Sequence, residues 1–188
     1  MAGQRADARR NYARLLAVAS QAVAEDGAAV SLEQIGRTAG VGSGTVRRHF
    51  PSRDALLEAV FEDHVEALCA DARDRAGADD ARDALAGWLH AVSAAAATLR
   101  GLAFALNREA GRAPCATSRL TEAGRPLVRR AAGRLTPGVS IADLLRLVTG
   151  IALATEHTPD PAGEAARLLD LALAGFLAGP LSSPAAPR

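Results

Sequence analysis

The sequence contains no lysine, and all 22 of its basic residues are arginine. Lysine-based catalysis and a Walker-type phosphate-binding loop, which both need a lysine, are therefore excluded. Aromatic residues make up only 3% of the chain, and no segment shows the apolar–polar alternation of strands. With 188 residues, 49% of them apolar, the chain is long enough to bury a core. These features predict an all-α protein.

Residues that carry metal or nucleophilic chemistry are scarce and scattered. The two cysteines, Cys69 and Cys115, belong to no motif, and we expect both to be free thiols. The spacings Cys-x-x-Cys, His-x-x-x-His and Glu-x-x-His are absent. Neither a G-x-S-x-G motif nor a dinucleotide-binding glycine pattern occurs. The sequence therefore predicts that the protein is not an enzyme and needs no cofactor.

The N-terminus has neither a long apolar run nor the pattern of a secretory leader. We therefore expect a cytoplasmic protein without a membrane partner. The formal net charge of +1 is unevenly distributed. Residues 1–56 hold eight arginines against five acids, whereas residues 57–188 hold fourteen against sixteen. A basic N-terminal part on a slightly acidic remainder suits a DNA-binding domain joined to a separate domain.

Residues 31–53, SLEQIGRTAGVGSGTVRRHFPSR, carry the most informative pattern. Ser31 is a good N-cap residue, and Gln34 three positions later predicts a capping box. Gly40 can adopt the positive φ that ends a helix. Ser43 is expected to cap a second helix, which must end by Phe50 because Pro51 restricts the residue before it. Two short helices joined by a small-residue turn form a helix-turn-helix, whose second helix enters the DNA major groove.

The second helix of this motif can be laid out at about 100° per residue. Val46 and Phe50 define its buried side, so Arg48 points away from the core with Thr45 beside it. We expect these two to meet base edges, and their neighbours on the flanks to meet phosphates. The residues expected to contact DNA are Ser31, Gly42, Ser43, Gly44, Thr45, Arg47, Arg48, His49 and Arg53.

About residues 9–61 closely resemble the N-terminal domain of TetR-family transcriptional regulators. The matching positions are Ile35, Ala39, Gly40, Val41, Gly44, Thr45, His49, Phe50, Ser52, Arg53 and Leu56. The family usually has a phosphate-contacting tyrosine where this chain has Arg47, and arginine can make the same contact with a full charge. The resemblance implies a DNA-binding regulator with a small-molecule pocket among its later helices.

Nine helices are expected in all. Besides the two of the motif they cover about residues 7–25, 52–75, 79–99, 102–109, 116–135, 140–157 and 161–178, with Pro126 either kinking or dividing the helix that contains it. Residues 1–7 are expected to be disordered, and the nearby Arg5, Arg9 and Arg10 either reach DNA or are simply solvated. We predict a DNA-binding domain over 1–53, a ligand-binding and dimerisation domain over 54–178, and a disordered tail over 179–188.

The resemblance implies a sensor pocket, for which the sequence offers only candidates. They are polar-capable or aromatic residues on otherwise apolar helices. Residues of these types at such positions are more often core side chains, as for Trp88 and Phe104, or solvated charges, as for Arg108, than ligand contacts. The candidates are His64, Trp88, Phe104, Asn107, Arg108 and His157.

The last two helices are apolar on nearly all sides, so they need cover from outside a single chain. An intermolecular four-helix bundle about a twofold axis would provide it. The expected interface residues are Leu144, Leu145, Ile151, Leu168, Leu171 and Phe176.

These patterns together predict a homodimeric transcriptional regulator, a repressor that binds a palindromic DNA operator and responds to a small-molecule effector. The alternative is a dimeric small-molecule-binding protein whose DNA-binding head is idle, which Arg47 in place of tyrosine slightly favours. The sequence identifies neither the effector, nor the operator, nor the regulated genes.

Overall fold

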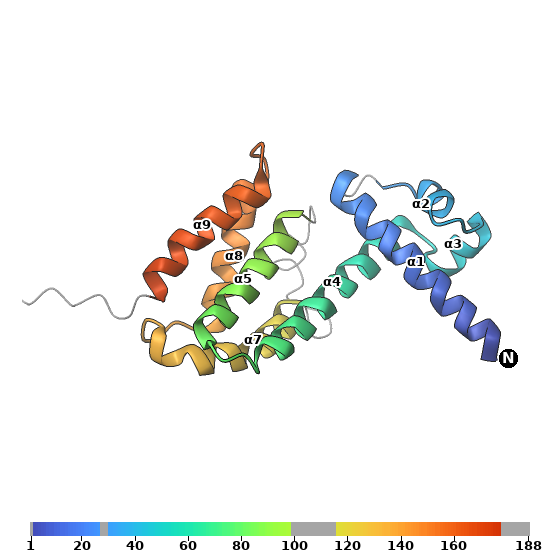
Figure 1. The fold of residues 1–188 in the computed structure, drawn as a ribbon. Helices are drawn as coiled ribbons and strands as arrows, with labels where there is room; N and C mark the ends of the chain where they lie inside the picture. The colour runs from blue at the N-terminus through green and yellow to red at the C-terminus, as the bar shows by residue number, and fades with distance from the viewer. Residues whose placement is uncertain (1, 27–29, 99–115, 178–188) are drawn as a thin grey trace, which may run out of the picture. The chain divides into compact units, whose positions relative to one another are not determined.

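The computed structural model describes residues 2–26, 30–98 and 116–177, which form helices and short connecting turns (Figure 1). No strand occurs within these ranges, which confirms the predicted all-α class. The α-helices are α1 (Ala2–Asp26), α2 (Leu32–Thr38), α3 (Ser43–His49), α4 (Arg53–Arg75), α5 (Ala81–Thr98), α7 (Ala116–Ala131), α8 (Ile141–Thr155) and α9 (Pro161–Phe176). A short 3₁₀ helix, Ala132–Arg134, follows α7.

Several predictions fall outside the described residues. These are the helix over 102–109, the tail over 179–188, the free thiol of Cys115 and three of the pocket candidates: Phe104, Asn107 and Arg108. Within the described ranges, none of the helices has both the length and the apolar character that a membrane span requires.

The chain divides into two compact units within α4, one up to His64 and the other from Val65 onward. We call them the N-terminal unit and the C-terminal unit. The domain boundary expected after residue 53 lies at the first residue of α4, so the N-terminal unit extends further along this helix than expected.

The N-terminal unit is built from α1, α2, α3 and the beginning of α4. One face of α1 is buried through Leu15, Ala19 and Val23, as its spacing predicts. The predicted disorder of residues 1–7 is wrong, because α1 begins at Ala2. The segment AGQRADAR contains alanine and arginine, which are strong helix formers, and no proline, so nothing stops the helix.

The predicted caps are confirmed in part. The Ser31 hydroxyl accepts the N–H of Gln34 at 3.4 Å, but the Gln34 side chain accepts from Arg37 at 2.7 Å, so the capping box is only half formed. The N-cap of α3 is Gly42, and Ser43 is already helical, so the predicted Ser43 cap is wrong. Ser52 caps α4, accepting the N–H of Ala55 at 3.1 Å.

The C-terminal unit packs α7, α8 and α9 against α5, which lies among them (Figure 1). Trp88 of α5 is fully buried, and its indole Nε1–H donates to the Leu68 carbonyl of α4 at 2.9 Å. The α7 helix continues through Pro126 to Ala131, so the proline does not divide it. Ser140 and Asp143 form a complete capping box at the start of α8.

Gly124 of α7 marks a close approach between helices in this unit. A Cβ atom placed there would lie 2.5 Å and 2.6 Å from two ring carbons of Trp88 and 2.7 Å from Cδ1 of Ile141. Because the Trp88 indole is fully buried in a packed core and has little room to move aside, the glycine sets how near α7 lies to its neighbours.

We expect Gly124→Ala to lower the free energy of unfolding by about 1–3 kcal/mol, because the added methyl overpacks this contact. Gly133→Ala is the control, since a Cβ there would meet nothing within 4 Å, and we expect it to change stability by less than about 0.5 kcal/mol. Denaturant unfolding of both variants measures the difference. Equal stability would show that α7 can move away without cost.

Candidate DNA interface and ligand cleft

The turn between α2 and α3 depends on two glycines. Gly40 has a φ of +66°, a conformation that other residues rarely adopt. The N–H of Val41 donates to the Gly36 carbonyl at 2.9 Å and closes the turn. A Cβ on Gly36 would lie only 2.8 Å from Cγ2 of Val46, so α3 rests directly on the backbone of α2. The predicted helix-turn-helix and the role of Gly40 are confirmed.

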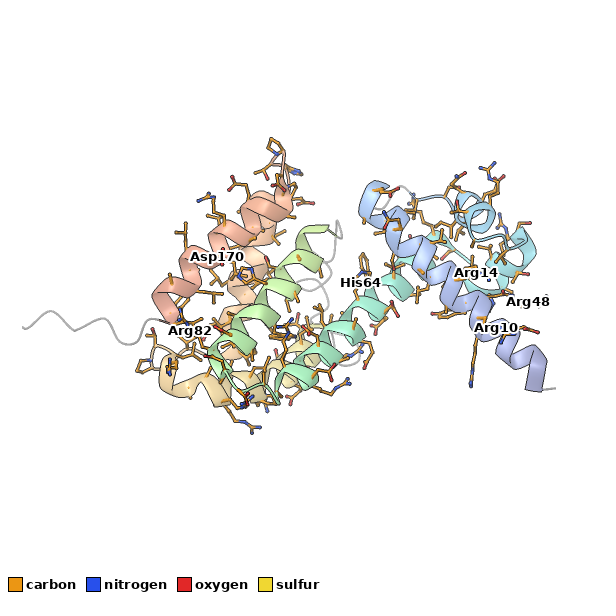
Figure 2. All side chains as sticks on the ribbon, in the orientation of Figure 1. Arg10, Arg14, Arg48, His64, Arg82 and Asp170 are labelled. Carbon is orange, nitrogen blue, oxygen red and sulfur yellow. The ribbon has the colours of Figure 1, made fainter. Side chains whose placement is uncertain are left out.

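On α3 the buried and exposed sides fall where the helical rotation predicts them. Val46 and Phe50 are each 1% exposed. Arg47 and Arg48 are exposed (Arg48 is labelled in Figure 2), and neither forms an ion pair within the part of the chain that the structure describes. Two cationic side chains are therefore available on the surface of a short helix, a common arrangement in DNA-binding motifs.

The half-buried His49 is held by α1. Its ring lies edge-on against Tyr12, with centroids 5.7 Å apart, and the Tyr12 ring also contacts Phe50 at 5.4 Å. This aromatic cluster fixes the end of α3 against α1 and leaves His49 less free than the two arginines.

The remaining predicted DNA contacts also lie on the surface of the N-terminal unit. Thr45 is half-buried beside Arg48, and the others are exposed: Ser31, Gly42, Ser43, Gly44 and Arg53. On α1, Arg9, Arg10 and Arg14 are exposed, and Arg10 pairs with Asp7 (Figure 2).

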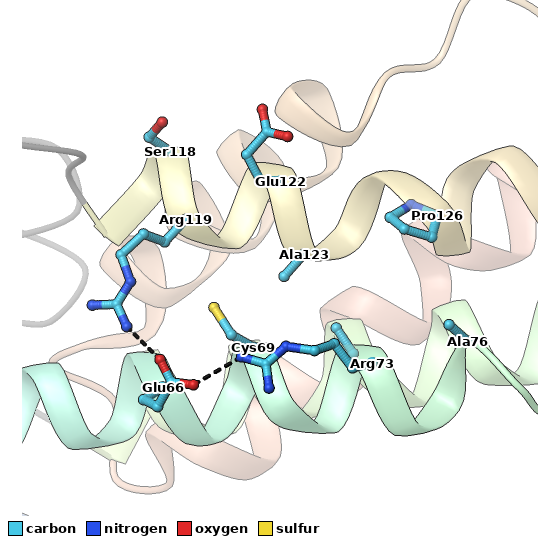
Figure 3. Close-up of a pocket in the computed structure, with 10 residues that line it drawn as sticks. Glu66, Cys69, Arg73, Ala76, Ser118, Arg119, Glu122, Ala123 and Pro126 are labelled. Carbon is cyan, nitrogen blue, oxygen red and sulfur yellow. Dashed lines mark hydrogen bonds and ion pairs between the residues drawn. The ribbon is translucent and has the colours of Figure 1, made fainter.

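The C-terminal unit contains a cleft of about 550 Å³ between α4 and α7 (Figure 3). Its floor is made of small or apolar side chains, and charged groups gather toward one end. The lining residues are Glu66, Cys69, Ala72, Arg73 and Ala76 from α4, and Ser118, Arg119, Glu122, Ala123 and Pro126 from α7. A cleft of this size, with polar groups beside an apolar floor, is typical of small-molecule sites.

One carboxylate at the charged end binds two guanidinium groups. Glu66 accepts from Arg73 Nη2 at 2.8 Å through one oxygen and from Arg119 Nη2 at 2.7 Å through the other (Figure 3). These two hydrogen bonds, from Arg73 first and Arg119 second, lower the pKa of Glu66 below its usual value. We call these three residues the Glu66 triad.

At the other end of the cleft, Arg130 of α7 holds the end of α4. Its guanidinium donates to the carbonyls of Ala76 at 2.6 Å and Ala78 at 2.5 Å, just past the last residue of the helix. Such contacts satisfy carbonyls that a helix end leaves without partners. The two helices are thus connected by arginines at both ends of the cleft.

Comparison with known proteins identifies both parts of the chain. Residues 15–60 match the family described as bacterial regulatory proteins, tetR family, and residues 80–178 match the C-terminal domain of SbtR-like transcriptional regulators. The chain belongs to the TetR family. It is a DNA-binding transcriptional regulator and not an enzyme.

Solved TetR-family structures agree. A TetR transcriptional regulator from Streptomyces coelicolor is 32% identical with a TM-score of 0.71, covering 89% of this chain and 98% of its own. One from Mycobacterium vanbaalenii is 30% identical with a TM-score of 0.66, covering 93% and 99%. RolR, solved with its ligand resorcinol, is 25% identical with a TM-score of 0.53, covering 90% and 88%. No curated protein sequence matches this regulator.

None of the described pocket candidates is among the residues that line the cleft. His64 belongs to the N-terminal unit, where its Nδ1 lies 2.8 Å from the Val60 carbonyl. Trp88 is a core residue whose only polar group is already bonded, and His157 is exposed just beyond α8.

The residues that do line the cleft were not predicted from the sequence. Glu66, Cys69 and Arg73 recur at i, i+3 and i+7, which places them on one face of the α4 helix. This spacing can be found in the sequence and would have indicated a shared face of α4. Arg119 lies 53 positions from Glu66, and no local pattern connects the two.

Of the six residues expected at a dimer interface, half belong to the core of their own chain. Leu144, Leu145 and Ile151 are 2%, 5% and 8% exposed. Leu168 and Phe176 are half-buried, and Leu171 is 62% exposed. Of these six residues, only Leu168, Leu171 and Phe176 retain exposed surface that a partner could cover.

We expect the two neighbouring arginines of α3 to act differently on DNA. Arg48→Ala should cost roughly 1–3 kcal/mol per half-site and relax base preference at one position, because a guanidinium can bind guanine through two hydrogen bonds. Arg47→Ala should weaken binding to all DNA sequences alike, because it removes a phosphate contact. It should also make the slope of log binding constant against log salt concentration less steep by about 1 per half-site.

Titrations of both variants across salt concentrations, against a library of operator variants, separate these effects. Each variant serves as the control for the other, since both side chains are exposed on the same helix. A change in base preference for Arg47→Ala, with only a salt effect for Arg48→Ala, would reverse the assignment.

Proposed function

We propose that this TetR-family regulator is a ligand-responsive repressor that binds a palindromic operator as a homodimer. The observation that carries the proposal is the pair of exposed arginines on α3, Arg47 and Arg48, which form no ion pair within the described residues. Placing that helix in the major groove of each half-site would let a twofold dimer read an inverted repeat. The contacts expected from the other residues of the motif belong to the same proposal.

Dimerisation through α8 and α9 is supported by apolar surface that a single chain leaves uncovered. Leu171 of α9 is 62% exposed and Leu153 of α8 is 43% exposed. Small residues are exposed on the same two helices, namely Gly150, Ala154, Ala174 and Gly175. Small residues allow two helices to approach closely, and large exposed leucines provide area to bury.

Ligand response is supported by the cleft in the C-terminal unit. RolR, a relative with the same fold, was solved with the small molecule resorcinol. An effector that binds only one conformation of this regulator would shift its equilibrium away from the form that binds DNA. The α4 helix contributes residues both to the cleft and to the N-terminal unit. It is therefore the element expected to couple effector binding to DNA binding.

Selection of random or genomic DNA fragments on the purified protein tests the proposal. We expect enrichment of an inverted repeat whose half-sites lie about one helical turn of DNA or a multiple apart. With Arg48→Ala, enrichment should weaken and lose base preference at one position of each half-site. Failure to enrich any sequence at low salt would instead favour a dimeric ligand-binding protein whose DNA-binding head is idle.

We expect Leu171→Arg to turn the dimer into a monomer, because a charge placed in the middle of an apolar interface would be buried without a partner. Ala162→Arg is the control, since it lies nine residues away on the same helix and therefore on its opposite side. Sedimentation at micromolar concentration should give twice the chain mass for the control and the single chain mass for Leu171→Arg. A monomeric wild-type protein would contradict the dimer proposal outright.

A further inference from the structure

The charged end of the cleft already binds a carboxylate, which the chain itself supplies. Glu66 places one oxygen on Arg73 and the other on Arg119 (Figure 3). In the Glu66 triad, two guanidinium groups therefore surround one carboxylate. The other acid of the lining, Glu122, pairs with Arg125 at 2.8 Å. Guanidinium groups arranged in this way suit a carboxylate and not a cation.

The Glu66 side chain is easy to replace. It is 59% exposed, and so is poorly confined, whereas Arg119 is only 27% exposed. Exposed ion pairs contribute little to stability because water solvates both partners when they separate. An anion that reaches Arg119 within the cleft therefore competes with a weakly held carboxylate for a guanidinium that is already in position.

The rest of the cleft suits an apolar body. Apart from Ser118 and Glu122, the lining beyond the triad brings no charge and little bulk, and consists of Cys69, Ala72, Ala76, Ala123 and Pro126. This surface runs along α4 and α7 toward the end held by Arg130. A molecule with an anionic group at one end and an apolar remainder would match both regions.

We propose that the cleft binds a small organic carboxylate with an apolar body, whose carboxylate takes the place of the Glu66 side chain on Arg119 and Arg73. Glu66 acts as an internal competitor that occupies the site in the absence of ligand. The inference rests on the proposed function, since this ligand would be the effector. Because the pair of Glu66 and Arg119 joins α4 to α7, binding replaces a link within the chain by a link to the ligand.

Calorimetry on the full-length dimer, without DNA, tests the proposal with 3-phenylpropionate and octanoate as probes. The matched amides and amines of the same carbon skeletons serve as neutral and cationic comparisons. At least one carboxylate is expected to bind, its amide at least about tenfold more weakly, and its amine not at all, because charge-assisted hydrogen bonds to arginine are lost.

Variants locate the binding. Glu66→Gln should tighten carboxylate binding about two- to fivefold, the effect of removing an exposed ion pair that competes with the ligand. Arg119→Gln should weaken it about tenfold or more, with Arg119→Lys in between because lysine keeps the charge but not the fork geometry. Arg129→Gln is the control, on the same helix, exposed and outside the lining, and should leave affinity within about twofold.

The proposal is overturned if neither carboxylate binds the wild type or Glu66→Gln, or if an amide binds as tightly as its acid. It is also overturned if Glu66→Gln weakens binding, since Glu66 would then assist the ligand. Carboxylate binding with the expected charge dependence but no release of the selected operator would refute ligand-controlled repression alone. Operator release by a neutral or cationic compound acting in the cleft would refute this inference and leave the proposed function standing.

Discussion

The position of one buried indole governs the architecture of the C-terminal unit. Trp88 of α5 donates its N–H to the Leu68 carbonyl of α4, and its ring edge fills the space above Gly124 of α7. A side chain this large, fully buried and bonded at its polar group, has little freedom to move. It therefore determines how α4 and α7 meet α5, and so determines the two walls between which the cleft opens.

The arginines of this protein follow two patterns, and the difference matters for what each surface can bind. Those of the cleft are partnered within the chain, where Arg119 and Arg73 hold Glu66 and Arg130 holds two backbone carbonyls. Arg47 and Arg48 of α3 form no ion pair within the described residues. The first pattern connects helices, whereas the second leaves charge available for a polyanion such as DNA.

Two glycines allow side chains of neighbouring helices to approach the backbone closely. Gly36 lets Val46 approach the backbone of α2, and Gly124 lets Trp88 approach that of α7. In each case the missing side chain fixes the distance between two elements that lie beside a functional surface. The DNA-binding motif and the cleft therefore both depend on backbone-to-side-chain contacts that even alanine would disturb.

The sequence alone determined the all-α class, the helix-turn-helix and most helix limits, because these depend on short-range chemistry. Gly40 in its positive-φ turn, Pro51 after α3 and the Val46–Phe50 spacing act over a few residues. The predictions that failed concern helix starts, where neighbouring residues are nearly equivalent alternatives. The N-cap of α3 is Gly42 and not Ser43, and α1 begins before Asp7. Only the tertiary structure decided which apolar residues of α8 face their own core, and that Glu66 meets Arg119 from 53 positions away. Helix packing sets those contacts, and periodicity within one helix carries no information about which face of another helix it meets.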